Sequence, residues 1–323
     1  MNIPDRAWQF WRDAFAVNGS VTLDVLRRIL AFGGFATLVC VTDRLTHHRP
    51  ELEVAVAPYE VAGAALGLLL VLRTNAGYER WWEGRKLWGG MVNRCRHLAV
   101  VALAYGPADP AWRQRVIRLV AAFPHAARQG LRGERTLPEV AALLGEEEAA
   151  RIAAARHMPA AVILAIGGHL RAALDRSGMD RAAFIQADRD LVELLDYVGG
   201  CERIRKTPLP RAYVVQIRRF IVLFLAALPF ALLKKIEWLT PLVTMFVAYP
   251  ILALDEIGDA LQDPFSPRAL NHLPLDDICR TVEGDLMGMA SAAGPDGAPP
   301  RIARGVDLGR AGESSEEQAG MVT

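Results

Sequence analysis

Four uncharged apolar segments constrain the fold of this chain more than any other feature. They span residues 29–42, 61–72, 220–233 and 238–254. Each is shorter than the roughly 20 apolar residues that a lone transmembrane helix needs. The aliphatic part of a flanking arginine can lie in the membrane while its guanidinium group reaches water, so each helix can extend beyond its uncharged part. The predicted membrane helices span about 25–45, 54–75, 211–233 and 238–256.

The composition allows a body that is partly in the membrane and partly in water. Hydrophobic residues make up 52% of the chain and charged residues 23%. The chain is therefore more hydrophobic than a typical soluble domain, but it has too many charged residues to lie wholly in the membrane. The net charge of +1 gives no global attraction to nucleic acid. The four cysteines lack the spacing of a zinc site or of a disulfide framework. We therefore expect no nucleic-acid partner and no cofactor.

Charged residues and tryptophans crowd together directly after the second apolar segment. Trp81, Trp82 and Trp88 lie there with Arg73 and Arg80. Tryptophan favours the boundary between hydrocarbon and water, and basic residues mark the cytoplasmic end of a membrane helix. This pattern predicts a membrane boundary with the helix leaving on the cytoplasmic side. The alternative is a soluble amphipathic helix with a solvated basic face.

The remaining chain divides into three parts. Residues 1–22 predict an interfacial helix that lies on the membrane or packs on a neighbouring helix, because Trp8, Trp11 and Phe15 recur at helical spacing. An insert over about 78–210 has helical periodicity, with glycine or proline breaks that include Gly106-Pro107 and Gly199-Gly200. Residues 289–323 are rich in Gly, Ala, Pro, Ser and Glu, which predicts a disordered tail.

Two stripes run along the second predicted membrane helix. Ala64, Leu68 and Leu72 follow one another at four-residue steps and so share one face, while Gly63 and Gly67 form a neighbouring small stripe. If several copies surround an axis, the small stripe suits contact between copies and the aliphatic stripe forms apolar rings that gate by dewetting. The alternative is an ordinary helix-packing face.

Several motifs in register resemble the bacterial bestrophin-like proteins. They are Arg73-Thr74-Asn75, Arg80-Trp81-Trp82-Glu83, Trp88-Gly89, Gly200-Cys201-Glu202-Arg203-Ile204, Thr207-Pro208-Leu209-Pro210, Leu228-Pro229-Phe230, Trp238-Leu239-Thr240-Pro241, Leu254-Asp255-Glu256-Ile257-Gly258-Asp259, Asp263-Pro264-Phe265 and Leu273-Pro274-Leu275. The resemblance extends from about Leu23 to Glu283, and the channel domain it implies spans 23–288.

The resemblance implies an all-α integral membrane protein that forms a homopentamer around a central pore. Each subunit would have four transmembrane helices, a helical cytosolic region and both termini in the cytoplasm, and the protein would lie in the bacterial inner membrane. The family's narrow neck maps to Ala64, Leu68 and Leu72. Its lower aperture maps to Phe184 or Ile185. The motif at the membrane interface, which we expect to support assembly, comprises Arg73, Asn75, Trp81, Trp82, Glu83 and Trp88.

The resemblance also implies conduction of monovalent ions. Bacterial relatives are associated with cations and animal ones with chloride, so it favours sodium or potassium here, with a calcium-independent anion channel as the alternative. Rings of charged residues in the cytosolic part of the pore would set the preference for cations or anions. The sequence leaves open which of Asp188, Arg189, Asp190 and Glu193 faces the pore axis. Animal members bind calcium through acidic residues after Asn-Pro-Phe, whereas residues 266–272 here contain no carboxylate. We therefore expect no activation by calcium.

Other classes of function have weaker support. The carboxylates of Asp255, Glu256, Asp259 and Asp263 recur at helical spacing and form a weak candidate metal site, with pairing to basic residues as the alternative. A membrane-bound enzyme would use these acids with Glu83 and His97. The chain has no Gly-rich phosphate loop and no Gly-x-Ser-x-Gly or His-Glu-x-x-His motif. We therefore expect no enzyme activity, and a helical scaffold without conduction is the third class.

Overall fold

The chain folds entirely into helices over the part that the structure describes. This computed structural model describes residues 21–46, 56–267, 269 and 271–293, together with Trp8, Trp11, Arg12 and Ala14. The helices are α2 (Thr22–Leu45), α3 (Val56–Tyr105), α4 (Pro110–Arg132), α5 (Pro138–Leu144), α6 (Glu146–Ala154), α7 (Met158–Asp175), α8 (Arg181–Lys206), α9 (Arg211–Ile236), the short 3-10 turn η2 (Glu237–Leu239), α10 (Thr240–Ala260) and α11 (Leu275–Ala292).

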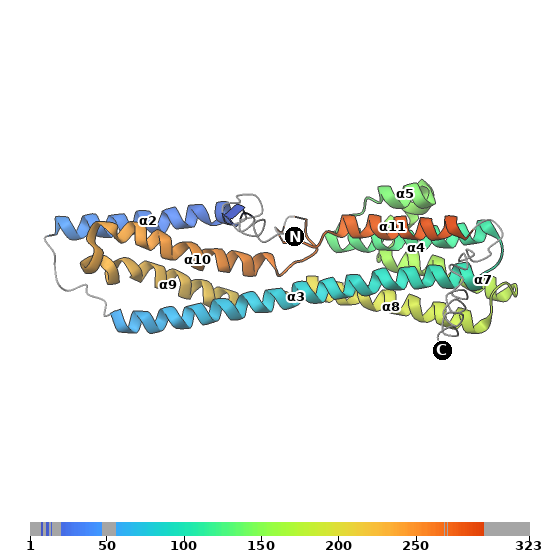
Figure 1. Ribbon diagram of the computed structural model, residues 1–323, viewed down its shortest axis with the longest axis horizontal. Coiled ribbons are helices and arrows are strands. Elements are labelled where there is room, and N and C mark those ends of the chain that lie inside the picture. Colours follow the sequence, from blue (N-terminus) through green and yellow to red (C-terminus); the bar gives the residue numbers. More distant parts are fainter. Residues whose placement is uncertain are drawn as a thin grey trace, which may run out of the picture.

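The molecule is a long rod with two halves that share α3 (Figure 1). In what we call the membrane half, α9 and α10 pack against the first part of α3, and α2 packs on α10 and α9. In what we call the helical bundle, α4, α8 and α11 pack against the second part of α3, α7 packs on α4 and α8, and α5 and α6 lie outside them. The 50 residues of α3 span about 75 Å at 1.5 Å per residue, so one rigid element connects the two halves.

The boundaries of three membrane helices agree with the sequence prediction to within a few residues, but α3 does not end near residue 75 as predicted. It continues without a break to Tyr105. The charge that follows Leu72 marks the predicted membrane boundary but does not end the helix, because no proline interrupts the chain between Pro58 and Pro107. The α11 helix also extends to Ala292, into the segment predicted to be disordered. The rest of that tail and most of residues 1–22 lie outside the described residues.

The α3 and α8 helices interlock through two glycines. A Cβ atom at Gly90 would lie 2.6 Å from the ring of Tyr197 on α8, and one at Gly200 would lie 2.9 Å from Leu87 on α3. Each glycine therefore makes room for a large side chain of the other helix. The predicted break at Gly199-Gly200 is wrong for this reason, because α8 runs straight through both residues and uses Gly200 for close packing.

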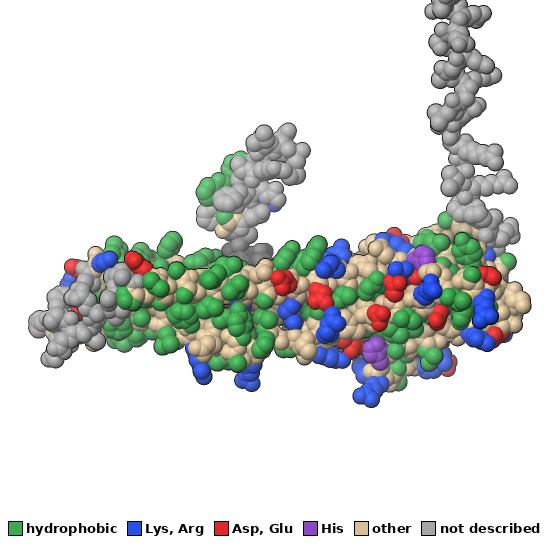
Figure 2. All heavy atoms as spheres, turned by 90° about the horizontal axis from the view of Figure 1, so that it is seen from below, with side chains coloured by type: hydrophobic (Ala, Val, Ile, Leu, Met, Phe, Trp, Pro, Cys, Tyr) green, Lys and Arg blue, Asp and Glu red, His purple; other side chains and the backbone are tan. Residues whose placement is uncertain are grey.

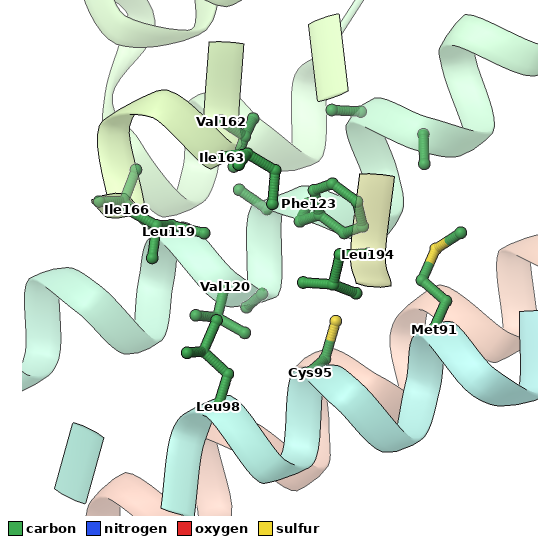
Figure 3. Close-up of a cluster of buried hydrophobic side chains, with 14 of the residues drawn as sticks. Met91, Cys95, Leu98, Leu119, Val120, Phe123, Val162, Ile163, Ile166 and Leu194 are labelled. Atoms are coloured by element: carbon green, nitrogen blue, oxygen red, sulfur yellow. The ribbon is translucent and has the colours of Figure 1, made fainter. Parts of the chain in front are cut away.

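The bundle has its own apolar core, which includes a helix that hydropathy alone would place in a membrane. Five helices among the described residues are long and apolar enough to span a bilayer, and α7 is one of them. However, Val162, Ile163 and Ile166 of α7 are buried, with Ile163 beside Phe123 of α4 and Ile166 beside Leu119 of the same helix (Figure 3). We therefore assign α7 to the bundle core and the other four helices to the membrane.

The membrane half is apolar on both its inside and its outside. Its core joins Ile29, Leu70, Leu225 and Leu252 from four helices. Its surface is also dominated by hydrophobic side chains, whereas the bundle surface carries many acidic and basic ones (Figure 2). Such an extended exposed apolar surface requires lipid or another copy of the chain to cover it. This chain is a membrane protein.

A buried polar network fastens α4 to its neighbours inside the bundle. His125 is fully buried, and its Nε2 atom lies 2.9 Å from Glu283 on α11. Nearby, Arg132 donates to both carboxylate oxygens of Asp276 at 3.0 and 2.6 Å. Burial, followed by the charge of Arg128, lowers the pKa of His125 below its ordinary value of 6.5. The folded bundle thus favours the neutral imidazole.

This network predicts a loss of stability in weak acid. As the pH falls below about 6.5 the unfolded chain protonates His125 more readily than the folded chain does, so the free energy of unfolding decreases. The hydrogen bonds from Arg132 lower the pKa of Asp276, so its contribution is lost only at more acidic pH, below its ordinary value of 3.8. We expect the midpoint of thermal unfolding to depend less on pH between pH 6.5 and 5 in His125→Gln than in the parent protein. A variant profile parallel to that of the parent would contradict this assignment.

Candidate functional site

The aliphatic stripe on α3 faces away from the chain's own core. Ala64, Leu68 and Leu72 are all exposed, Leu68 to 61% and Leu72 to 51%. On the opposite face of the same turns, Leu66 and Leu70 are 1% exposed and pack against the other membrane helices. The three stripe residues are therefore free to contact another copy, lipid or a pore.

The neighbouring small stripe is not a continuous contact surface for another copy. A Cβ atom at Gly63 would lie 3.2 Å from the Phe224 ring of α9, so Gly63 packs within its own chain. Gly67, by contrast, is exposed and has no neighbouring atom within 4 Å of that position. The expectation that both glycines pack between copies is therefore wrong for Gly63.

Three arginines from three helices converge on carboxylates at the end of α10. Arg73 of α3 is fully buried and pairs with Asp255, and its other terminal nitrogen lies 3.2 Å from Asp259. Arg218 of α9 reaches the same two carboxylates at 3.2 and 3.3 Å. Arg28 of α2 pairs with the third, Glu256, at 2.9 Å. We call this set of three arginines and three acids the arginine–carboxylate network.

This network accounts for most of the weak metal candidates. Asp255, Glu256 and Asp259 accept hydrogen bonds from arginines, and Asp263 accepts one from the backbone amide of Phe265 at 3.2 Å. Among the described residues, no three His, Cys, Asp or Glu side chains are grouped so that they would hold a metal ion. The arrangement instead provides a charge-paired clamp between helices.

The motif after the network is a junction between α3, the end of α8 and the loop that precedes α11. The guanidinium of Arg80 donates to the carbonyl oxygens of Thr207 at 2.7 Å and Gln262 at 3.2 Å. The indole of Trp81 donates to the carbonyl of Asn271 at 2.8 Å. Glu83 pairs with Arg203 at 2.8 Å. These residues hold the two halves of the molecule together.

Three other residues of the predicted interface motif occupy different environments. Asn75 is exposed and donates to Glu79 at 3.1 Å, and Trp82 remains 46% exposed. Trp88, however, is fully buried in the bundle core. It lies about 24 Å along the helix from Leu72 at 1.5 Å per residue, so its predicted place at the membrane boundary is wrong.

The α8 helix distinguishes the two candidate aperture residues. Ile185 is 45% exposed, whereas Phe184 is partly buried against the bundle core. Asp188 and Arg189 are exposed near Ile185. Ile185 is therefore the better placed of the two to line an opening.

Two other charges of α8 are used for pairing inside the chain. Asp190 is fully buried and contacts Arg94 at 3.1 Å and His97 at 2.6 Å, and Glu193 also pairs with Arg94 at 2.6 Å. His97 thus belongs to this α3–α8 cluster in the bundle, apart from the carboxylates of the membrane half. The residues suggested for an enzyme do not form one site.

Sequence reasoning missed the partners in the arginine–carboxylate network. Asp255 and Asp259 lie one turn apart on one helix, so their spacing indicated two carboxylates on one face. Nothing in the spacing indicated that Arg73 and Arg218 would reach them, because these arginines belong to other helices. The network could not have been predicted without knowing how the helices pack.

Comparisons with known proteins agree with this architecture. Residues 1–287 match the family model described as "Bacterial/Fungal Bestrophin protein". A Synechocystis protein named a voltage-dependent anion channel-forming protein is 32% identical over 88% of this chain and 92% of its own. One of the same name from Escherichia coli K12 is 34% identical over 89% of this chain and 94% of its own. The crystal structure of a bacterial bestrophin homologue from Klebsiella pneumoniae aligns with a TM-score of 0.77 and 29% identity, covering 83% of this chain and 98% of that one.

The buried part of the network should dominate the stability of the membrane half. Asp255→Asn breaks the buried pair with Arg73 and leaves this buried guanidinium paired with Asp259 alone; breaking a buried pair typically costs about 3–5 kcal/mol. For a chain of this size we expect the midpoint of thermal unfolding in detergent to fall by roughly 10 °C. The control is Asp175→Asn, which breaks an exposed pair with Arg171 and should change stability by less than about 1 kcal/mol. Equal midpoints for the two variants would mean that the Arg73 pair does not hold the helices together.

Proposed function

The chain belongs to the bacterial and fungal bestrophin family, and from this membership we propose that it forms a homopentameric channel for small monovalent ions. The observation that carries the proposal is the exposed stripe of Ala64, Leu68 and Leu72, on a helix whose opposite face is buried. Side chains in that position can meet their copies around an axis. The names of the curated relatives also support a channel.

We propose that the membrane half spans the bacterial inner membrane, with the bundle and both termini in the cytoplasm. Basic residues favour the cytoplasmic end of a membrane helix. Arg27 at the start of α2 and Arg211 and Arg219 at the start of α9 are exposed. These helix starts lie at the end of the membrane half nearest the bundle (Figure 1). The distribution of positive charge supports this orientation.

The proposed neck gates by its apolar character. Five copies of Leu68 and Leu72 would form successive rings without charge or hydrogen-bonding groups. Water leaves a sufficiently narrow constriction of this kind, and ions do not cross it when it is dry. The smaller Ala64 makes the outer end of the neck wider than the two leucine rings. Leu72 forms the innermost ring in this arrangement.

For ion preference we propose anion conduction as the first candidate. The cation preference implied by the sequence resemblance has no support in the names of the relatives, which are called anion channel-forming proteins. Sodium or potassium conduction is the second candidate because Asp188 and Asp196 are exposed on the same face of α8 as Ile185. Rings of carboxylates on the pore axis would favour cations.

The proposed channel does not require calcium. Calcium prefers six to eight oxygen ligands, several of them carboxylates, and residues 266–272 contain none. Asp263, just before this segment, accepts a hydrogen bond from the backbone amide of Phe265. No carboxylate within the segment is therefore available for a calcium clasp.

The deciding experiment is current through the purified protein in a planar bilayer, with a tenfold sodium chloride gradient and calcium chelated on both sides. Reversal near the chloride equilibrium potential is expected for the first candidate and reversal near the sodium potential for the second. Leu72→Ala should increase the unitary conductance several-fold because it widens the narrowest ring. Leu223→Ala, which removes a 69% exposed leucine from α9, is the control and should leave conductance unchanged.

Two outcomes would overturn the channel proposal. One is the absence of current from the parent and from Leu72→Ala, even after calcium is restored. The other is an equal change in conductance for the Leu72 and Leu223 variants, because the effect would then arise from bilayer contact rather than from a neck. Either result would favour a scaffold or an enzyme.

Assembly provides a separate prediction. Trp82 is 46% exposed beside Trp81, so we propose that it packs against the neighbouring copy. Trp82→Ala should convert a large part of the pentamer to smaller species in detergent, as measured by native mass spectrometry. The control is Trp238→Ala, which removes a 57% exposed tryptophan near the opposite end of the membrane half and should not change the mass. An intact Trp82→Ala pentamer would count against this contact.

A further inference from the structure

A cleft at the far end of the bundle has the composition of a ligand site and is not used by the proposed pore. It lies between α4, α6 and α7, has a volume of about 730 Å³ and falls within the usual size range of small-molecule sites. Trp112, Leu164 and Ala165 contribute apolar surface, and Leu164 is 78% exposed. An exposed leucine beside a tryptophan provides apolar contact for the body of a small molecule.

The cleft also carries more positive than negative charge. Arg115, Arg151 and Arg176 line it together with the acids Asp109 and Glu148. Arg115 and Arg151 both donate to the same Oε2 atom of Glu148, at 2.7 and 2.5 Å. One carboxylate is thus shared by two guanidinium groups, which leaves donor capacity on both.

The remaining two charged residues are not paired with each other. Asp109 caps α4 by accepting a hydrogen bond from the backbone amide of Ala111 at 2.9 Å. Arg176 is exposed, and among the residues the structure describes it has no ion-pair partner. A guanidinium group with free donors binds phosphate through two parallel hydrogen bonds. We propose that this cleft binds a soluble organic phosphate, with the phosphate at the arginines and an apolar body against Trp112 and Leu164.

The position of the cleft argues against a lipid headgroup as the source of the phosphate. Pro107 and Gly178 at its rim adjoin the end of α3, the helix that runs from the membrane half to the far end of the bundle (Figure 1). Thirty residues of helix separate Asn75 from Tyr105, which is about 45 Å at 1.5 Å per residue. A ligand from solution can reach this end, whereas a headgroup in the bilayer cannot.

Isothermal titration calorimetry on the full-length protein in detergent tests the proposal with phenyl phosphate as the probe. We expect phenyl phosphate to bind at least tenfold more tightly than inorganic phosphate, which lacks the apolar body, or phenol, which lacks the charge. Nanodiscs that contain long-chain phosphatidic acid supply the lipid arm, and the affinity for phenyl phosphate should be the same in them as in phosphatidylcholine nanodiscs, because a headgroup held in the bilayer cannot reach the cleft. Competition by the phosphatidic acid of the nanodisc would overturn the assignment to a soluble ligand.

Two variants with matched controls locate the binding. Arg176→Gln should weaken phenyl phosphate binding about tenfold, whereas Arg118→Gln, another exposed arginine one helical turn from Arg115, should not. Gly168 lines the cleft on α7, and a Cβ atom there would meet no atom within 4 Å, so Gly168→Leu fills the cleft without a clash. The matched control is Gly284→Leu, at an exposed helical glycine with equally open space on α11.

Gly168→Leu should abolish binding and Gly284→Leu should retain it. Unchanged binding in Gly168→Leu, or no binding of phenyl phosphate to the parent protein, would overturn the proposal. A loss of pentamer mass in Gly168→Leu alone would assign the cleft to a neighbouring copy instead. Because binding is measured without any current, its failure is distinguishable from failure of the channel proposal.

Discussion

The convergence of three arginines on the end of α10 is the interaction on which the rest of the membrane half depends. Arg73 is fully buried, and a buried charge is tolerated only when it is paired and hydrogen-bonded. Its pairing with Asp255 fixes the rotation of α3 about its own axis. Successive residues on an α-helix are about 100° apart, so an inward Arg73 directs the preceding Leu72 away from the core. The exposed stripe is therefore a consequence of the ion pair as much as of its own leucines.

The continuity of α3 extends this constraint to the bundle. The helix that presents Leu72 in the membrane half also carries Gly90, which receives Tyr197, and Arg94, which pairs with Asp190. No hinge separates these contacts, because the same backbone hydrogen-bond ladder runs through all of them. A tilt of α3 in the bundle would therefore move the stripe in the membrane half. Coupling through one rigid element needs no chain of intermediate side-chain changes.

Apolar segments and helix breaks could be predicted from the sequence because their signals are local. The starts of α9 after Pro210 and of α4 after Pro107 agree with the prolines that precede them. Gly200 and Trp88 could not be interpreted in the same way. A glycine that ends a helix and one that receives a side chain look alike until the partner, here Leu87, is known. Likewise, a tryptophan suits both a membrane boundary and a buried core, and only the packing of the bundle assigned Trp88 to the core.

Some charged side chains of α8 are paired within the chain and others are exposed, and this difference bears directly on ion preference. Asp190 and Glu193 on α8 are both paired with Arg94 within the chain, and Asp190 also contacts His97. The proposed aliphatic neck has no charge of its own. Exposed charged residues of α8, such as Asp188, Arg189 and Asp196, can determine whether a pore favours anions or cations. In a proposed pentamer each of them is repeated five times, so one substitution changes the charge of a ring by five. The exposed charges of α8 could therefore change the ion preference of the proposed channel while the helix packing and the arginine–carboxylate network stay the same.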